Sequence, residues 1–221
     1  MNIVFQNLSK DDLYHRCMYA AIAHAIMVGK YDLLAAEQSW DGGNYIVQNF
    51  EGVKIVIAFQ PDRYICAIQN NNNAKGQCIN NNAITNCYAG TDMAIKRLAE
   101  EEILPYMLIN YDGAEIPFVS SSFWGNDGYN YSNQNEEYIL NDAEGLINSF
   151  LSDAETSKLY WKEYYDMSKE QQELVEEIYQ RRLAEKGIMH LNDSEKNKLH
   201  EWFESVTECV ESFREMLIMY E

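Results

Sequence analysis

The sequence predicts an α+β protein in which an N-terminal helix and an antiparallel β meander precede an acidic, mainly helical C-terminal region. Three observations support this class. The segment from Cys17 to Val28 is apolar on nearly every side of a helix, which is typical of a helix buried all round. Short β-branched and aromatic runs follow it, separated by turn residues. From about Asn135 onward the pattern is helical throughout. We therefore expect an α+β module over 1–134 and an acidic helical region over 135–221, packed together as one compact unit.

The N-terminal elements have recognisable ends. Asp11 and Asp12 suit the start of the first helix, and Gly29 suits its end. A short second helix is expected over 31–38. Glu51 and Gly52 form a hairpin-sized gap between two strand-like runs, and a turn at Pro61 leads into a third. The expected meander strands are 44–50, 53–59 and 63–69.

The middle of the chain gives weaker signals. The stretch 69–90 is rich in asparagine and has no convincing period, so we expect a long connection. Thr91 is expected to cap a helix that ends near Pro105, whereas 106–109 fits either a helix or a strand. After a turn at Asp112, residues 115–123 are expected to form one strand. The later helices are expected at 136–151, 155–166, 168–186 and 193–219.

Net charge restricts the classes of partner. The 221 residues include 17 Lys and Arg against 35 Asp and Glu, a net charge of −18. Such a surface repels phosphate backbones and anionic lipids, so direct nucleic-acid and membrane binding are disfavoured. Residues 131–221 carry 9 basic and 21 acidic side chains, which is two thirds of the excess. No signal peptide or membrane-length apolar run is apparent, and we expect a soluble cytoplasmic protein.

The last expected helix carries the clearest acidic pattern. An apolar stripe that includes Leu199, Phe203 and Phe213 marks its core side. Five glutamates recur on the other side at steps of three and four residues, which would place them in one row: Glu201, Glu204, Glu208, Glu211 and Glu215. This glutamate row is the candidate partner-binding surface for a cationic protein, although a plain solvated face that aids solubility fits the same pattern.

Two loops form a second candidate site. The residues Trp40, Asp41, Asn44 and Tyr45 surround a glycine pair, and Trp124, Asn126 and Asp127 surround another glycine. Glycine lets a backbone approach a ligand, while Trp and Tyr give rigid contact area. Both loops lie at expected strand ends and would form one site if they met. The alternative is that these aromatic side chains are buried core residues.

Familiar catalytic and metal-binding patterns are missing from the sequence. The five cysteines are scattered without a CxxC pair, so we expect reduced thiols and no metal site. Within one helix Cys17 and His24 lie about 10 Å apart along the axis, too far for a thiol–imidazole dyad, and a buried core histidine is the simpler interpretation. The serines 120–122 have no identifiable histidine partner. Neither phosphate-binding glycine motif is present. We expect no cofactor.

Several segments together resemble a family of uncharacterised bacterial cytosolic proteins. They are SWDGGNY at 39–45, FEGVKIVIAF at 50–59, SSFWGND at 121–127 and WKEYYDMSKEQQELVEEIYQRR at 161–182. The resemblance covers most of the chain and is loosest in the asparagine-rich stretch and the final helix. It implies a bacterial or mobile-element origin, with no activity and no catalytic residues to carry over.

These features favour a non-enzymatic acidic protein that neutralises a basic partner, as a toxin-immunity protein or an inhibitor of a nucleic-acid enzyme would. Rows of carboxylates can occupy a cationic groove in place of phosphates, and opposite charge speeds encounter. The alternative is a small-molecule or hydrolytic site at the two loops, with Asp41 or Asp127 as base. A scaffolding subunit is a third class, which would show an exposed apolar patch and form a homo-oligomer.

Overall fold

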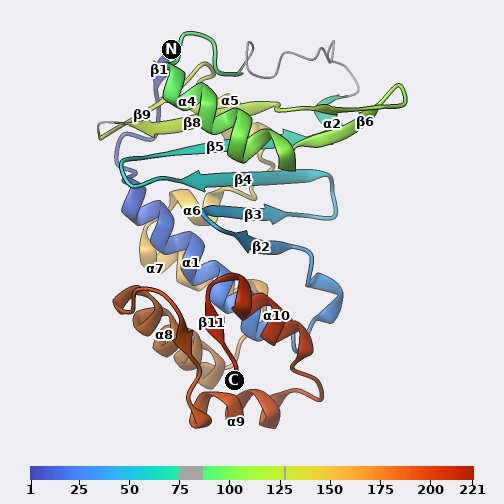
Figure 1. Ribbon diagram of the computed structural model, residues 1–221, viewed down its shortest axis with the longest axis vertical. Coiled ribbons are helices and arrows are strands. Elements are labelled where there is room, and N and C mark those ends of the chain that lie inside the picture. Colours follow the sequence, from blue (N-terminus) through green and yellow to red (C-terminus); the bar gives the residue numbers. More distant parts are fainter. Residues whose placement is uncertain (75–86, 127) are drawn as a thin grey trace. The chain divides into compact units, whose positions relative to one another are not determined.

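A computed structural model describes residues 1–74, 87–126 and 128–221, which fall into two compact units (Figure 1). The first unit comprises Met1–Leu13 and Gly43–Leu151, and the second comprises Tyr14–Gly42 and Ser152–Glu221. The predicted α+β class is confirmed. Residues 135–151, which the sequence analysis grouped with the acidic helices, belong to the unit that holds most of the strands.

The first unit contains an antiparallel sheet whose described strands follow the order β1-β9-β8-β5-β4-β3. All three predicted meander strands are confirmed to within two residues. The bounds are β1 Asn2–Ile3, β3 Asn44–Gln48, β4 Val53–Phe59, β5 Arg63–Asn70, β8 Ser121–Asn126 and β9 Tyr129–Ser132.

A separate two-stranded hairpin consists of β6 Leu108–Tyr111 and β7 Ala114–Pro117, joined at Asp112 and Gly113. Both turn residues have positive φ, 52° and 81°, the conformation that lets a two-residue turn match the twist of its strands. The predicted single strand over 115–123 is wrong. The chain changes partner in the middle of it, since Phe118 N donates to Met107 O whereas Ser120 N donates to Ile68 O.

Helices of the first unit are short. They are α2 Asn71–Ala74, α4 Met93–Leu98, α5 Glu136–Asp142 and α6 Asn148–Leu151, and α4 continues through a π turn Ala99–Ile103 and a 3-10 turn Leu104–Tyr106. The cap of α4 is Asp92, whose carboxylate accepts from Ile95 N at 2.8 Å, and the predicted Thr91 cap is wrong. The predicted helix over 136–151 is also wrong, because Glu144 and Gly145 adopt positive φ between α5 and α6. Most of the asparagine-rich stretch, residues 75–86, lies outside the described residues.

The sheet of the first unit is covered on both faces. On one face, side chains of β4, β5 and β8 pack with residues between 87 and 107 in a single apolar cluster that includes Ala58, Ile65 and Trp124. On the other face, Tyr45 packs edge-to-face on Phe150 with ring centroids 5.5 Å apart. The near-continuous burial along β4 and β5 follows from this arrangement.

The second unit is mainly helical. Its part of α1 (Lys10–Met27) begins at Tyr14, and the predicted first helix is confirmed. The predicted helix over 31–38 is wrong: only a 3-10 turn, Asp32–Leu34, forms before β2. The remaining elements are β2 Gln38–Asp41, α7 Ala154–Tyr164, α8 Lys169–Ala184, β10 Met189–His190, α9 Asp193–Trp202, α10 Thr207–Glu215 and β11 Ile218–Met219.

One predicted helix of this unit, 193–219, is broken into α9 and α10. Phe203 leaves the helix with extended φ and ψ, and its buried ring lies where a Cβ on Gly29 would come within 2.5 Å. Gly29 therefore provides the space that the phenylalanine ring fills. The hydroxyl of Ser205 accepts from Thr207 N at 3.3 Å, which offers the backbone a local alternative to the helix.

Within the described residues, every helix is too short or too polar to cross a lipid bilayer.

Gly125 on β8 illustrates how tightly the first unit is packed. A Cβ at this position would lie 2.1 Å from Cε1 of Tyr64, a buried residue whose hydroxyl donates to Asn130 at 2.7 Å. The glycine of the FWGND segment is thus required by the ring of Tyr64 on the neighbouring strand.

We expect Gly125→Ala to lower the free energy of unfolding by about 3 kcal/mol, because the buried ring and its hydrogen bond must shift. Gly128→Ala is the matched control: nothing lies within 4 Å of the new methyl group, and only the φ of +79° should cost about 1 kcal/mol. Urea unfolding of both variants measures the difference. Equal destabilisation would contradict this explanation of the glycine.

Candidate functional site: the acidic face of the second unit

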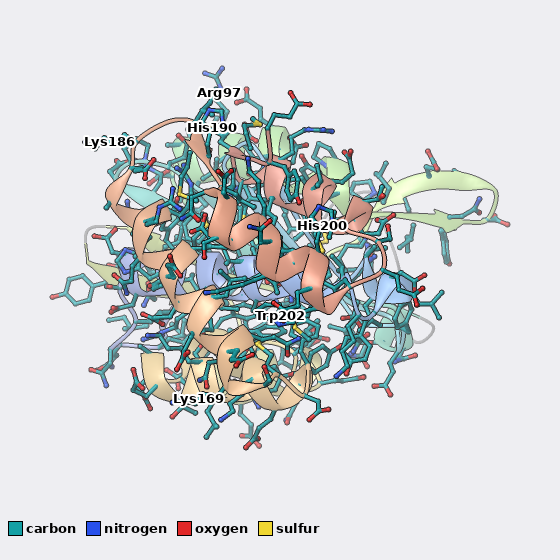
Figure 2. The ribbon with its side chains drawn as sticks, turned by 90° about the horizontal axis from the view of Figure 1, so that it is seen from below. Arg97, Lys169, Lys186, His190, His200 and Trp202 are labelled. Carbon is teal, nitrogen blue, oxygen red and sulfur yellow. The ribbon has the colours of Figure 1, made fainter. Side chains whose placement is uncertain are left out.

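The five glutamates of the predicted row do not lie on one helix. Glu201 lies in the last turn of α9, Glu204 lies in the link, and the other three lie on α10. Figure 2 labels Trp202 at the end of α9, where the helix stops and the row is interrupted. Glu208, Glu211 and Glu215 keep their steps of three and four residues and so share one face of α10.

Two of these carboxylates already have partners in their own unit. Glu211 pairs with Arg214 at 2.7 Å, and Glu215 accepts a hydrogen bond from Trp40 N at 2.8 Å. Burial raises the pKa of Glu215, and the Trp40 hydrogen bond opposes part of that effect. Glu201, Glu204 and Glu208 are exposed and form no ion pair with the described residues. The part of the row open to a partner is therefore these three glutamates, which we call the open acidic group.

The apolar stripe predicted beside the row is only partly buried. Leu199, Phe203 and Phe213 are buried, whereas Leu217 is 46% exposed and adopts a φ of 58°. Cys209 and Met216 take up core positions on α10 and after it. The helix break at Phe203 interrupts the continuous period, so Phe213 still faces the core whereas Leu217, chosen from the same period, does not.

The candidate loop site is divided between the units. Trp40 and Asp41 lie on β2 of the second unit, where the Trp40 indole donates to Gly42 O at 3.0 Å within its own turn. Asn44 and Tyr45 lie on β3 of the first unit, and both are buried. Trp124 is buried in the apolar cluster of the first unit. Asn126 ends β8, and Asp127 lies outside the described residues.

Within the first unit, the sheet register sets the separation of these residues. Asn44 pairs with Ala58, Ala58 with Ile65, and Ile65 with Trp124. Three strand spacings of about 4.8 Å therefore separate Asn44 from Trp124, roughly 14 Å. The space between them is filled by buried Ala58 and Ile65 side chains, so the two residues do not line one cavity.

A buried carboxylate contacts the serine triplet noted in the sequence. Asp142 accepts from the hydroxyls of Ser120 at 2.5 Å and Ser121 at 2.6 Å, and from the amide of Asn73 at 2.7 Å. All four histidines of the chain lie in the second unit, so no imidazole base of the first unit can activate either serine. These hydrogen bonds hold the C-terminal end of α5 against the sheet.

In the second unit, His24 belongs to a buried polar network. Its Nδ1 lies 2.9 Å from the hydroxyl of Tyr165, which in turn accepts from the amide of Gln38 at 3.0 Å. The hydroxyl and Nδ1 share one hydrogen bond, in which the tautomer of the imidazole sets the donor. Burial lowers the pKa of His24 to about 4, and the nearby carbonyl of Ala35 opposes part of this shift. The ring is a buried core histidine, as its alanine-rich surroundings suggested, and its Nε2 has no hydrogen-bond partner among the described residues.

The described cysteines are buried free thiols: Cys17, Cys66, Cys87 and Cys209. Burial raises the pKa of Cys87 to about 12 and that of Cys209 to about 11, so neither is a thiolate near neutral pH. Among the described residues, no three His, Cys, Asp or Glu side chains gather in an arrangement that could hold a metal ion.

The first unit also contains a cleft that the sequence did not predict. It has a volume of about 560 Å³ and lies between the β3–β4 turn and strand β6. Its lining is rich in carboxamides and includes all of β6. The sequence signal was the ambiguous segment 106–109 followed by the Asp112–Gly113 turn, which together encode a hairpin strand.

Comparison of the chain with protein-family models, with curated proteins and with solved structures finds no match.

The His24 network predicts a pH dependence of stability. The imidazole has a pKa of about 4 in the folded state against an ordinary 6.5, so the unfolded chain binds the proton more readily. Stability should be complete above pH 6.5 and fall by about 3 kcal/mol as the pH drops to about 4. Burial also raises the pKa values of Glu37 and Glu215, which contribute in the opposite direction over part of this range.

The His24→Gln variant isolates the contribution of the histidine. Glutamine can still hydrogen-bond to the Tyr165 hydroxyl but does not titrate, so the loss of stability between pH 6.5 and 4 should be smaller by about 3 kcal/mol. His15→Gln, which removes an exposed histidine from the same helix, should retain the wild-type slope. Denaturant unfolding across this pH range measures both, and parallel curves for wild type and His24→Gln would contradict the network.

Proposed function

We propose that this chain is a non-enzymatic acidic binding protein that neutralises a basic partner protein, as a toxin-immunity protein or an inhibitor of a nucleic-acid enzyme does. The observation that supports the proposal is the open acidic group: Glu201, Glu204 and Glu208 are exposed and have no cation among the described residues. These carboxylates are available to a partner without breaking an ion pair.

The charge of the second unit supports the same proposal. Its residues include 20 acidic and 11 basic side chains, so nine carboxylates lack an internal counter-charge whatever the pairing. Several of the cations are already occupied: Arg181 binds the buried Glu195 at 2.6 Å, Lys158 binds Glu176 at 2.9 Å, and Arg214 binds Glu211. A cationic partner would supply the missing charge and would associate faster at low salt.

The buried thiols are compatible with a reducing compartment, and we place the protein in the cytoplasm as part of this proposal.

The triple variant Glu201→Gln/Glu204→Gln/Glu208→Gln tests the open acidic group. Wild type, attached to a resin, should capture a basic protein from lysate of the source cells, and mass spectrometry identifies it. With that protein purified, the triple variant should bind at least tenfold more weakly, because charged interface contacts are lost. The slope of log affinity against log salt should also become shallower.

A matched control neutralises three carboxylates elsewhere in the same unit: Glu163→Gln/Glu170→Gln/Glu173→Gln, on α7 and α8. It removes the same net charge and should change the affinity by less than about threefold, because long-range attraction is screened. Equal losses for both variants would indicate a general charge effect. Capture of only acidic or neutral proteins would overturn the proposed function.

A further inference from the structure

Strand β6 presents an unpaired edge. Phe118 N donates to Met107 O at 2.8 Å, which makes 107 and 118 a hydrogen-bonded pair. By the alternation of an antiparallel ladder, Ile109 with Ile116 and Tyr111 with Ala114 are the next such pairs. The backbone N–H and C=O groups of Leu108 and Asn110 therefore point away from β7. Within the described residues β6 pairs with β7 alone, so these four groups have no strand partner.

The unpaired edge lines the cleft described above. Leu108, Ile109, Asn110 and Tyr111 form one wall, and Gln48, Asn49, Val53 and Lys54 at the ends of β3 and β4 belong to the same lining. Figure 1 shows the β6 hairpin extending from the end of the sheet at which β3 turns into β4. Leu108 and Tyr111 are 43% and 46% exposed, so the wall offers apolar side chains as well as backbone groups.

The surroundings of the cleft favour a cationic occupant. Glu51 lies in the β3–β4 turn between lining residues, Asp112 follows Tyr111, and Glu115 is the cross-strand partner of Asn110. All three are exposed and form no ion pair with the described residues. The ammonium of Lys54 is directed to the carbonyl of Tyr106 at 3.3 Å. The first unit as a whole carries 15 acidic against 6 basic side chains.

We propose that the cleft beside β6 binds an extended, lysine- or arginine-containing segment of a partner protein, which adds as a strand to the edge formed by Leu108 and Asn110. Backbone hydrogen bonds would give affinity, and the exposed carboxylates would select cationic side chains. The same charge disfavours pairing of β6 with its copy in a second molecule, because that contact would contain Asp112 and Glu115 from both copies, and their negative charges would repel. This site is separate from the open acidic group, and its test is independent of the proposed function.

The first experiment uses a defined probe, an N-acetylated and C-amidated hexapeptide of alternating lysine and valine, titrated into the ¹⁵N-labelled full chain. NMR should show shifts at Leu108 and Asn110, and hydrogen exchange of these two amides should slow. The amides of Ile109 and Tyr111, already bonded to β7, should change little. A hexapeptide of alternating glutamate and valine should bind at least tenfold more weakly.

A chemical control removes the backbone donors from the probe. The same hexapeptide N-methylated at all six residue amides keeps its charge and side chains but loses the six backbone N–H donors of a strand, so its affinity should fall at least tenfold. Equal binding of the methylated and unmethylated peptides would overturn strand addition. Because this comparison uses the wild-type chain, misfolding of a variant cannot affect its result.

Variants of the chain complete the test. Asn110→Pro removes one edge N–H that β7 does not use and should abolish the protection of Leu108, whereas Asn110→Thr keeps the backbone and should bind as wild type. Glu51→Gln/Asp112→Asn/Glu115→Gln should weaken binding and flatten its salt dependence. The triple variant of the open acidic group should bind the peptide normally, which separates the two surfaces.

Two results would overturn the inference. Shifts confined to residues 48–54 without protection of Leu108 and Asn110 would mean that the peptide binds by charge alone. A concentration-dependent dimer in sedimentation velocity that Asn110→Pro abolishes would mean that the edge receives a second copy of this chain.

Discussion

The continuous antiparallel register from β3 through β4 and β5 to β8 is the constraint on which the first unit depends. It places Asn44, Ala58, Ile65 and Trp124 in one row across the sheet, and side chains in such a row share a face. That row buries Trp124 in the core and keeps it apart from Asn44. The chain changes partner between Phe118, which still pairs with β6, and Ser120, which pairs with β5, and the hairpin before that change keeps an open edge.

Charge is distributed differently over the folded units than along the sequence. Two thirds of the excess lies after residue 130, yet each unit carries a net charge of −9 when its own acidic and basic residues are counted. The reason is that Glu136, Glu137, Asp142 and Glu144 follow residue 130 in the sequence but belong to the first unit, whereas residues 14–42, which belong to the second, carry a net charge of only −1. An excess of acidic side chains is thus a property of both units, and each unit carries one of the two proposed partner surfaces.

The sequence was most informative where one local signal dominates. The meander and α1 were predicted closely, because alternation and continuous apolarity are both short-range patterns. Elements that end through tertiary contacts were predicted poorly. The break after Trp202 arises from a phenylalanine ring beside Gly29, more than 170 positions earlier in the chain, and no helical period encodes that contact. The candidate site shows the same limit. The sequence spacing predicted one row of five glutamates, but the row is interrupted where α9 ends, and spacing does not show that Arg214 and Trp40 N already bind two of the carboxylates. The open edge of β6 could not be predicted from the sequence for a further reason. A strand edge is open only when no other strand pairs with it, and the sequence pattern does not show which strands pair.

The second unit is assembled from two stretches of chain, with most of the first unit inserted between them. The hydrogen bond between His24 and Tyr165 spans 141 positions. At about 5–20 residues per second, a ribosome needs roughly 7–28 s to make that intervening length. During this interval the His24 imidazole lacks the tyrosine hydroxyl with which it shares a hydrogen bond in the folded chain, so the second unit can complete this network only after both of its stretches have been synthesised.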